Sequence, residues 1–216
     1  MKLKYTLRVF PVIAMVLLAS CEDSSFLAEP PYSFTSPENF YKTESDLKIA
    51  LVGCYSTINT KSVPGASVAD GTYDRGLLYM LQGVDELLPN TTDYSGDFVR
   101  LSYLPSHTYL SNFWAAYFAG INRCNLLIEK AAGVDMNEMV KEQIISEARF
   151  LRAFFYYHLA SCFGGVPVTT SSVPDNNAPR DNLETVYSLI IEDLEHAYNT
   201  LNNSAINTGG ANKWTA

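Results

Sequence analysis

Apolar residues recur at steps of three and four along four stretches of the chain, which is the spacing that puts them on one face of an α-helix. Three of the four predicted helices run from Thr43 or Ser45 to about Asn59, from Thr108 or Ser111 to Ala131, and from Asp181 or Asn182 to about Leu201. Each has one apolar stripe that needs a neighbour, so the pattern predicts helices that pack against one another.

The remaining helix carries the most aromatic stretch of the chain. Asp135 is a suitable N-cap, and Glu138 three residues later completes a capping box. Gly164 and Gly165 are expected to end the helix, since glycine accepts the backbone conformation of a helix stop. Its apolar stripe is Val140, Ile144, Ala148, Leu151, Phe155, Leu159 and Cys162, and Phe150, Phe154 and Tyr157 widen it. A stripe this wide predicts that other helices cover more than one side.

Two stretches break the helical pattern. Residues Lys61–Leu104 are rich in glycine and tyrosine and contain two prolines, so they are predicted to be irregular, with a short helix possible at Leu77–Gln82. An irregular stretch of this length is uncommon unless it has a function. The last residues, Lys213–Ala216, resemble the first turn of a fifth helix with nothing after it, which predicts that the sequence is part of a longer protein.

The N-terminus has the pattern of an export signal. Met1–Arg8 carries three positive charges and no acid, and Val9–Leu18 is apolar but shorter than the ~20 residues of a membrane-spanning helix. The small residues Ala19 and Ser20 before Cys21 resemble the lipobox of bacterial lipoproteins, which implies that Cys21 is acylated. An ordinary signal peptide with a chance cysteine is the alternative. The predicted organisation is a signal peptide at 1–20, a proline-bearing tether at 21–39 and a helical domain at 40–216.

Composition narrows the class of protein. The chain has 216 residues, of which 47% are hydrophobic and 18% charged, enough for one domain with a core. Its formal net charge is -8, and an acidic surface argues against nucleic-acid binding, which needs a basic footprint.

The thiols and imidazoles show no catalytic or metal-binding spacing. Beyond Cys21, the cysteines Cys54, Cys124 and Cys162 are expected to be buried free thiols, with one disulfide as the alternative. His158 lies four residues before Cys162, but an aromatic helix without a third ligand predicts a packed histidine. Asp93–Asp97 starts like a calcium loop, yet Phe98 replaces the glycine of an EF-hand and Leu104 its last glutamate. Another kind of calcium site is left open.

Several short sequence motifs follow one another in a characteristic order. They are the lipobox, Phe40–Leu47, Asp85-Glu86, Trp114–Tyr117, Ile121–Asn125, Glu147–Ala153, Phe163–Val168 and Ile191–Leu194. In this order they resemble the SusD/RagB family of outer-membrane nutrient-binding lipoproteins. The run Glu147-Ala-Arg-Phe-Leu-Arg-Ala153 with the Gly-Gly-Val-Pro stop is the most specific part. Family members are about twice as long, so the resemblance implies an N-terminal portion.

The resemblance implies an all-α fold of tetratricopeptide-like helical repeats with long irregular loops, although the sequence shows no clean 34-residue period. It also implies a lipoprotein on the outer face of the outer membrane that captures oligosaccharides and passes them to a SusC-like TonB-dependent transporter. Neither catalysis nor a cofactor is implied, and Asp85-Glu86 becomes a structural anchor of its loop. Two alternatives are a peptide-binding uptake lipoprotein, as on the RagB side of the family, and a helical scaffold without a small ligand.

Sugar binding needs flat aromatic surfaces for the apolar face of the ring, with carboxylates or arginine nearby for its hydroxyls. Two stretches of the irregular region supply this mixture. The predicted ligand residues are Tyr94, Asp97, Phe98, Arg100 and Tyr103, with a smaller group at Tyr73, Asp74 and Arg75. The alternative is that these aromatic side chains only pin the loop to the helices.

Overall fold

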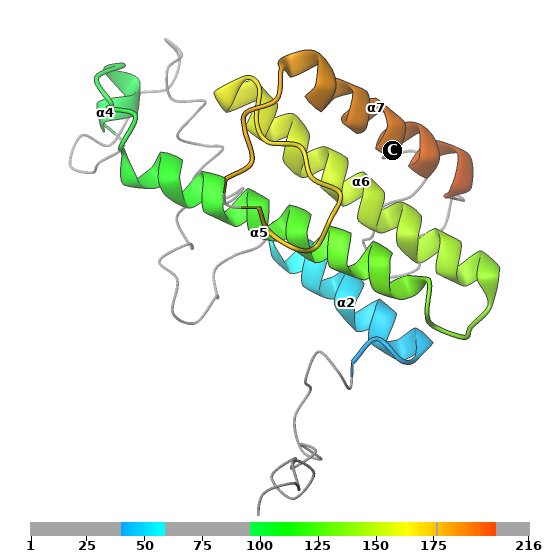
Figure 1. Cartoon of the computed structure of the whole chain (residues 1–216). Helices are drawn as coiled ribbons and strands as arrows, with labels where there is room; N and C mark the ends of the chain where they lie inside the picture. The colour runs from blue at the N-terminus through cyan, green and yellow to red at the C-terminus, as the bar shows by residue number, and fades with distance from the viewer. Residues whose placement is uncertain (1–39, 59–95, 176, 202–216) are drawn as a thin grey trace, which may run out of the picture. The chain divides into compact units, whose positions relative to one another are not determined.

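A computed structural model describes residues 40–58, 96–175 and 177–201, all within the unit Glu38–Ala216. Among these residues the helices are α2 (Glu44–Ser56), α4 (Gly96–Val99), α5 (Thr108–Ala131), α6 (Glu138–Phe163) and α7 (Leu183–Thr200), and there are no strands (Figure 1). The fold is therefore all-α, as predicted. Residues 1–39, the predicted helix Leu77–Gln82 and the predicted turn Lys213–Ala216 lie outside the described residues.

The helix starts follow from side-chain caps. The Thr43 hydroxyl of α2 accepts a hydrogen bond from the Asp46 amide at 3.2 Å, and the Asp46 carboxylate accepts from the Thr43 amide at 2.9 Å, which is a capping box. Asn182 caps α7, one of the two predicted positions. For α6 the predicted cap Asp135 was wrong: Asn137 accepts from the amides of the two residues after Glu138 and starts the helix there.

Helix α6 is the centre of the bundle. It packs against α5 and α7, and α2 lies against both α5 and α6 (Figure 1). The short turn 132–137 joins α5 to α6, so the two run antiparallel. Helix α7 also runs antiparallel to α6, because Ser146 faces His196 while Arg152 faces Asp193. These successive antiparallel pairs make the fold tetratricopeptide-like.

The buried faces are those that the periodicity predicted, with two exceptions in α6. Tyr157, which was expected to widen the stripe, is 50% exposed. In α6 the stripe residues from Ile144 to Leu159 are buried, and in α2 so are Leu47 and Leu51. Cys162, however, is exposed. The last turn of α6 instead directs Phe163 inward, where its ring contacts those of Phe113 and Trp114 at centroid distances of 6.1 and 5.1 Å.

The stop of α6 needs its two glycines for different reasons. Gly164 has φ of 74°, in the left-handed region that favours glycine. Gly165 passes so close to the Asp181 carbonyl that an added Cβ would lie 2.1 Å from that oxygen. The chain leaving α6 is thereby pressed against the residues that lead into α7.

None of the helices among the described residues is long and apolar enough to cross a membrane.

Candidate functional site

The described part of the predicted ligand segment folds into α4 and the turn after it. The amide of Ser102 donates to the Asp97 carbonyl at 2.9 Å and that of Leu101 to the Phe98 carbonyl at 3.2 Å. Leu101 has φ of 53°, uncommon for a residue with a side chain. We call residues Gly96–His107 the α4 segment. The sequence predicted irregular structure here, but residues Gly96–Val99 form one helical turn. This turn is closed by backbone hydrogen bonds between nearby residues, which a hydrophobic pattern does not reveal.

Two aromatic rings form the base of the α4 segment. Phe98 is buried, with 4% of its surface exposed, and its ring stacks on Tyr103 with centroids 4.7 Å apart and 23° between the planes. The His107 ring meets Phe98 edge-on at 4.8 Å. Tyr103 itself is 42% exposed. The Phe98 ring thus supports that of Tyr103 from within, and its role as a ligand residue stays a prediction.

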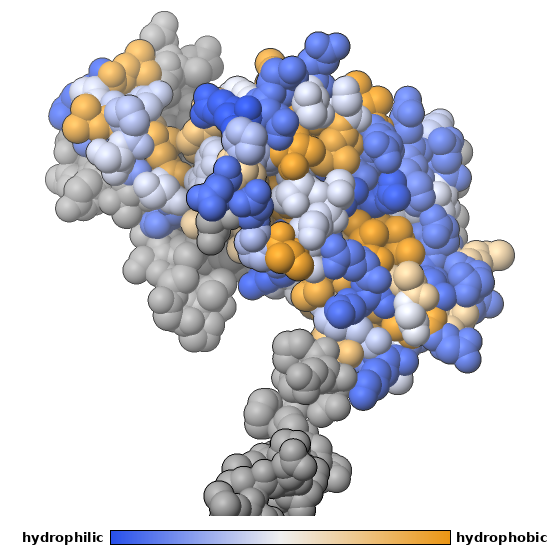
Figure 2. Space-filling model, viewed as in Figure 1, coloured by the Kyte–Doolittle hydropathy of each residue, from blue (hydrophilic) through white to orange (hydrophobic). Residues whose placement is uncertain are grey.

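Exposed side chains of mixed character surround Tyr103. Leu101 and Leu104 are 70% and 69% exposed, and Arg100 is also exposed. The space-filling view shows apolar surface at the α4 end of the molecule, with polar residues beside it (Figure 2). Of the predicted ligand residues, the structure thus brings Asp97, Arg100 and Tyr103 to one short segment. Tyr94, Tyr73, Asp74 and Arg75 lie outside the described residues, and their roles stay predictions.

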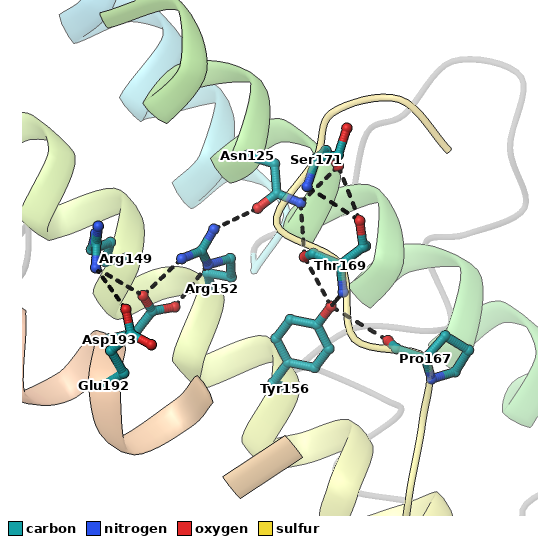
Figure 3. Close-up of polar contacts among 9 residues, drawn as sticks. All are labelled: Asn125, Arg149, Arg152, Tyr156, Pro167, Thr169, Ser171, Glu192 and Asp193. Atoms are coloured by element: carbon teal, nitrogen blue, oxygen red, sulfur yellow. Dashed lines mark hydrogen bonds and ion pairs between the residues drawn. The ribbon is translucent and has the colours of Figure 1, made fainter. Parts of the chain in front are cut away.

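A second polar cluster lies inside the bundle and was not predicted. Arg152 donates from Nε and Nη2 to the two carboxylate oxygens of Asp193, at 2.7 and 2.8 Å, and from Nη1 to the Asn125 amide oxygen at 2.8 Å (Figure 3). All three side chains are buried. Burial alone would lower the pKa of Arg152, but the hydrogen bonds and charge of Asp193 raise it above the ordinary value. This bidentate pair joins α6 to α7 and, through Asn125, to α5.

The same cluster holds the connection between α6 and α7, residues 164–182. The Asn125 amide nitrogen donates to the carbonyls of Thr169 and Ser171 at 3.1 and 3.0 Å. The Tyr156 hydroxyl accepts from the Thr169 amide at 2.9 Å and lies 3.2 Å from the Thr169 carbonyl (Figure 3). The carboxylate of Asp181 accepts from the Val168 amide at 2.8 Å. The partners of these side chains are one another and the chain's own backbone, so this cluster is structural.

These residues left a signal in the sequence. Asn125, Glu147, Arg152 and Asp193 are polar residues at buried positions of otherwise apolar helix faces. Buried polar groups are nearly always hydrogen-bonded, so such interruptions indicate partners across the bundle. Glu147 accepts from the Tyr55 hydroxyl at 2.8 Å and thereby ties α6 to α2. The partners themselves could not be read from the sequence, because they come from other helices.

The histidine and thiol expectations can now be compared with the structure. His158 packs among the rings of Phe154, Tyr157 and Tyr117 at centroid distances of 4.5, 5.4 and 5.8 Å, which confirms a packed histidine. Burial lowers its pKa. Although Cys162 is exposed as a residue, partial burial of its thiol raises its pKa to about 11, so it stays protonated at neutral pH.

Comparison with known proteins identifies the family of this chain. A SusD-like family model, described as "Starch-binding associating with outer membrane", matches residues 79–216. The chain belongs to the SusD-like family.

The relatives extend well beyond this sequence. The chain is 28% identical over 211 residues to the SusD-like protein P25 of Formosa agariphila, covering 91% of this chain and 38% of that protein. The fold matches a "Laminarin binding SusD-like protein" with a TM-score of 0.68 at 23% identity, over 80% of this chain and 38% of that one. It also matches surface glycan-binding protein A of Bacteroides fluxus, with a TM-score of 0.67 at 25% identity, over 81% of this chain and 38% of that one. The chain thus spans about two fifths of the length of the relatives it matches.

Proposed function

We propose that this protein is a cell-surface lipoprotein, held to the outer membrane through Cys21, that captures oligosaccharides and delivers them to a TonB-dependent transporter. Tyr103 is the observation that carries the binding step. Its ring is backed on one side by Phe98 and is 42% exposed, so it offers an aromatic surface to the apolar face of a sugar. Arg100 and Asp97 lie close by in the chain and can bind hydroxyl groups.

The comparisons support glycans as the ligand class. The family description names starch, and two structural neighbours are named for binding laminarin and for binding glycans. Sugar rings present apolar faces, which suits an exposed tyrosine. Tyr94, Tyr73, Asp74 and Arg75 belong to the same proposed surface on sequence grounds alone.

Binding is tested with the purified protein against starch and laminarin, by affinity electrophoresis and by calorimetry. If Tyr103 is the platform, Tyr103→Ala weakens binding about tenfold or more, which is ~1.4 kcal/mol or above. Tyr198→Ala is the matched control, because Tyr198 is also about half exposed, at 52%, but lies on α7. Equal affinities for the two variants would exclude Tyr103 as the platform.

The ligand class is tested with a wider panel. Binding to peptides with no response to any glycan would replace the proposed function with peptide uptake. No response to either class would favour a helical scaffold.

The membrane anchor is tested independently of the ligand. Mass spectrometry of protein from the membrane fraction is expected to show a lipid-modified Cys21 at the mature N-terminus. In Cys21→Ser the modification is lost and the protein moves to the soluble fraction.

Delivery to a transporter is tested separately. A TonB-dependent transporter is expected to co-purify with the native protein from membranes, and growth on the bound glycan is expected to fall when either partner is deleted.

A further inference from the structure

Two cysteines meet inside the bundle. Cys54 of α2 and Cys124 of α5 are both free and fully buried, with 0% exposed, as expected from the sequence, and they lie on helices that pack against each other. Their chain neighbours touch: the Arg123 guanidinium donates to the Gly53 carbonyl at 3.2 Å and to the Thr57 hydroxyl at 3.0 Å. The two thiols are therefore buried where α2 packs on α5.

We propose that Cys54 and Cys124 form a disulfide that joins α2 covalently to α5 in the exported protein. Both cysteines are buried on packed helices whose neighbouring residues are hydrogen-bonded, and this places the two side chains where a disulfide bond of ~2.05 Å can form between them. Cys162 is a poor competitor, because it is exposed on the last turn of α6 while the other two are buried together.

The oxidation is a thiol–disulfide exchange with an external disulfide, either a small-molecule disulfide or that of an oxidoreductase. One cysteine thiolate attacks a sulfur of the oxidant, forming a mixed disulfide and releasing a thiolate that takes up the proton lost by the attacking thiol. The second thiolate attacks the protein sulfur of the mixed disulfide. The protein loses two electrons and two protons, and the external disulfide is reduced to two thiols.

Burial sets the time at which this bond forms. A thiol must lose its proton to attack, and burial together with the neighbouring Cys54 thiol raises the pKa of Cys124 well above its ordinary value. In the folded, reduced protein the exchange is slow for that reason and because no oxidant reaches the pair. The bond therefore forms while α2 and α5 are coming together, and packing then shields it from reductants. Its formation in the cell requires an oxidising compartment, so it rests on the exported location proposed above.

The bond has a consequence for the proposed binding surface. All the predicted ligand residues, from Tyr73 to Tyr103, lie in the stretch of chain between Cys54 and Cys124. A disulfide would fix both ends of that stretch to the bundle.

The test begins with the full chain refolded with oxidised and reduced glutathione, compared with the same chain refolded in a phosphine reductant. Free thiols are alkylated and the protein is digested with trypsin without reduction. The expected product joins peptide Ile49–Lys61 to peptide Cys124–Lys130, with the mass of two hydrogen atoms missing. Peptide Ala153–Arg180, which holds Cys162, is expected to be alkylated.

A thermal melt gives a second readout. The oxidised protein is expected to melt roughly 5–15 °C above the reduced protein. This difference disappears in Cys54→Ala/Cys124→Ala and persists in Cys162→Ala, which is the matched control.

Separate alkylation of Cys54 and Cys124 after oxidative refolding would overturn the proposal, as would a link from either to Cys162 or Cys21. Protein taken from the cell envelope with thiol trapping is expected to carry the same joined peptide. Free thiols there would overturn the bond in the cell even if it forms in glutathione. Glycan binding is measured separately, so neither result is confused with a failure of the proposed function.

Discussion

Two connections of this protein differ in how they are held. The connection from α6 to α7, residues 164–182, is hydrogen-bonded to the bundle: Asn125 donates to the Thr169 carbonyl, and the Tyr156 hydroxyl accepts from the Thr169 amide. Within the connection, the Asp181 carboxylate accepts from the Val168 amide. The α4 segment, Gly96–His107, is closed by its own backbone and by the stack of Tyr103 on Phe98. One is fixed by the bundle, and the other presents exposed side chains on a locally closed turn.

This difference separates structural from functional residues. Polar side chains that are buried and hydrogen-bonded to one another and to the backbone are not available to a ligand. An exposed tyrosine on a supported ring, with charged groups nearby in the chain, keeps that capacity. The conspicuous arginines of the Glu147–Ala153 run thus serve the bundle, although they are the most recognisable part of the sequence. Arg149 lies 3.6 Å from Glu192 and 3.7 Å from Asp193, again across to α7.

The difference between the two connections predicts that the largest loss of folding stability follows from replacing Arg152. Arg152→Met leaves the Asp193 carboxylate buried without its bidentate partner and the Asn125 oxygen without its donor. We expect the free energy of unfolding to fall by about 3–5 kcal/mol, measured by chemical denaturation followed by circular dichroism. The control Lys48→Met removes the pair with Glu44, in which both side chains are 40% exposed, and is expected to cost less than about 1 kcal/mol.

A double variant sharpens this prediction. Arg152→Met/Asp193→Leu removes both charges, so it should be more stable than Arg152→Met alone. If instead Arg152→Met were no more damaging than Lys48→Met, the buried cluster would not be what holds the α6–α7 connection.

The helices of this fold could be predicted because their signals are local. The stripe of α5 and the caps Thr43 and Asn182 lie within a few residues of the backbone that they organise. The misplaced cap of α6 shows the limit of such signals: Asp135 and Asn137 are both good caps, and the turn that joins α5 to α6 decides between them. Cys162 was wrongly predicted to be buried. Three or four residues after Leu159, either Cys162 or Phe163 could face the core, and in the structure Phe163 packs there.

The sites were harder to predict because their contacts are not local. Arg152 on α6 binds Asp193 on α7, and the sequence around each residue does not show which residue it will contact. The burial of Phe98 beneath Tyr103 depends on a turn closed by backbone bonds, which a composition rich in aromatic residues cannot reveal. The composition did single out the stretch of chain that contains the exposed Tyr103, since aromatic and charged residues gather there.

The next prediction compares two tyrosine hydroxyls. Tyr156→Phe removes the group that accepts from the Thr169 amide, leaving a partly buried donor unpaired, so the free energy of unfolding should fall by about 1–3 kcal/mol. Amide exchange of Thr169 should accelerate with it. Tyr103→Phe keeps the ring stack on an exposed side chain and is expected to stay within about 0.5 kcal/mol of the parent protein. Equal losses in the two variants would mean that the α4 segment is held as firmly as the α6–α7 connection.

The smallest effect is expected at the edge of the α6–α7 connection. Glu129 of α5 accepts from both the hydroxyl and the amide of Ser172. The Ser172 hydroxyl, followed by its amide, holds the pKa of Glu129 below its ordinary value of 4.5. Because the folded pKa lies below the unfolded one, this contribution is fully present above about pH 4.5 and is lost as the pH falls through the folded value.

Glu129 is exposed, so solvent screens the bond, and a local measurement is needed to detect it. The Ser172 amide resonance should titrate with the pKa of Glu129, reporting the loss of its charged acceptor in acid. In Glu129→Gln a carbonyl oxygen still accepts, but that titration disappears while the resonance of the Thr169 amide, held by neutral Tyr156, stays unchanged. If Thr169 moved together with Ser172 through the same pH range, the whole connection would depend on this exposed carboxylate rather than on the buried cluster. The bundle would then hold its second connection as loosely as it holds the α4 segment.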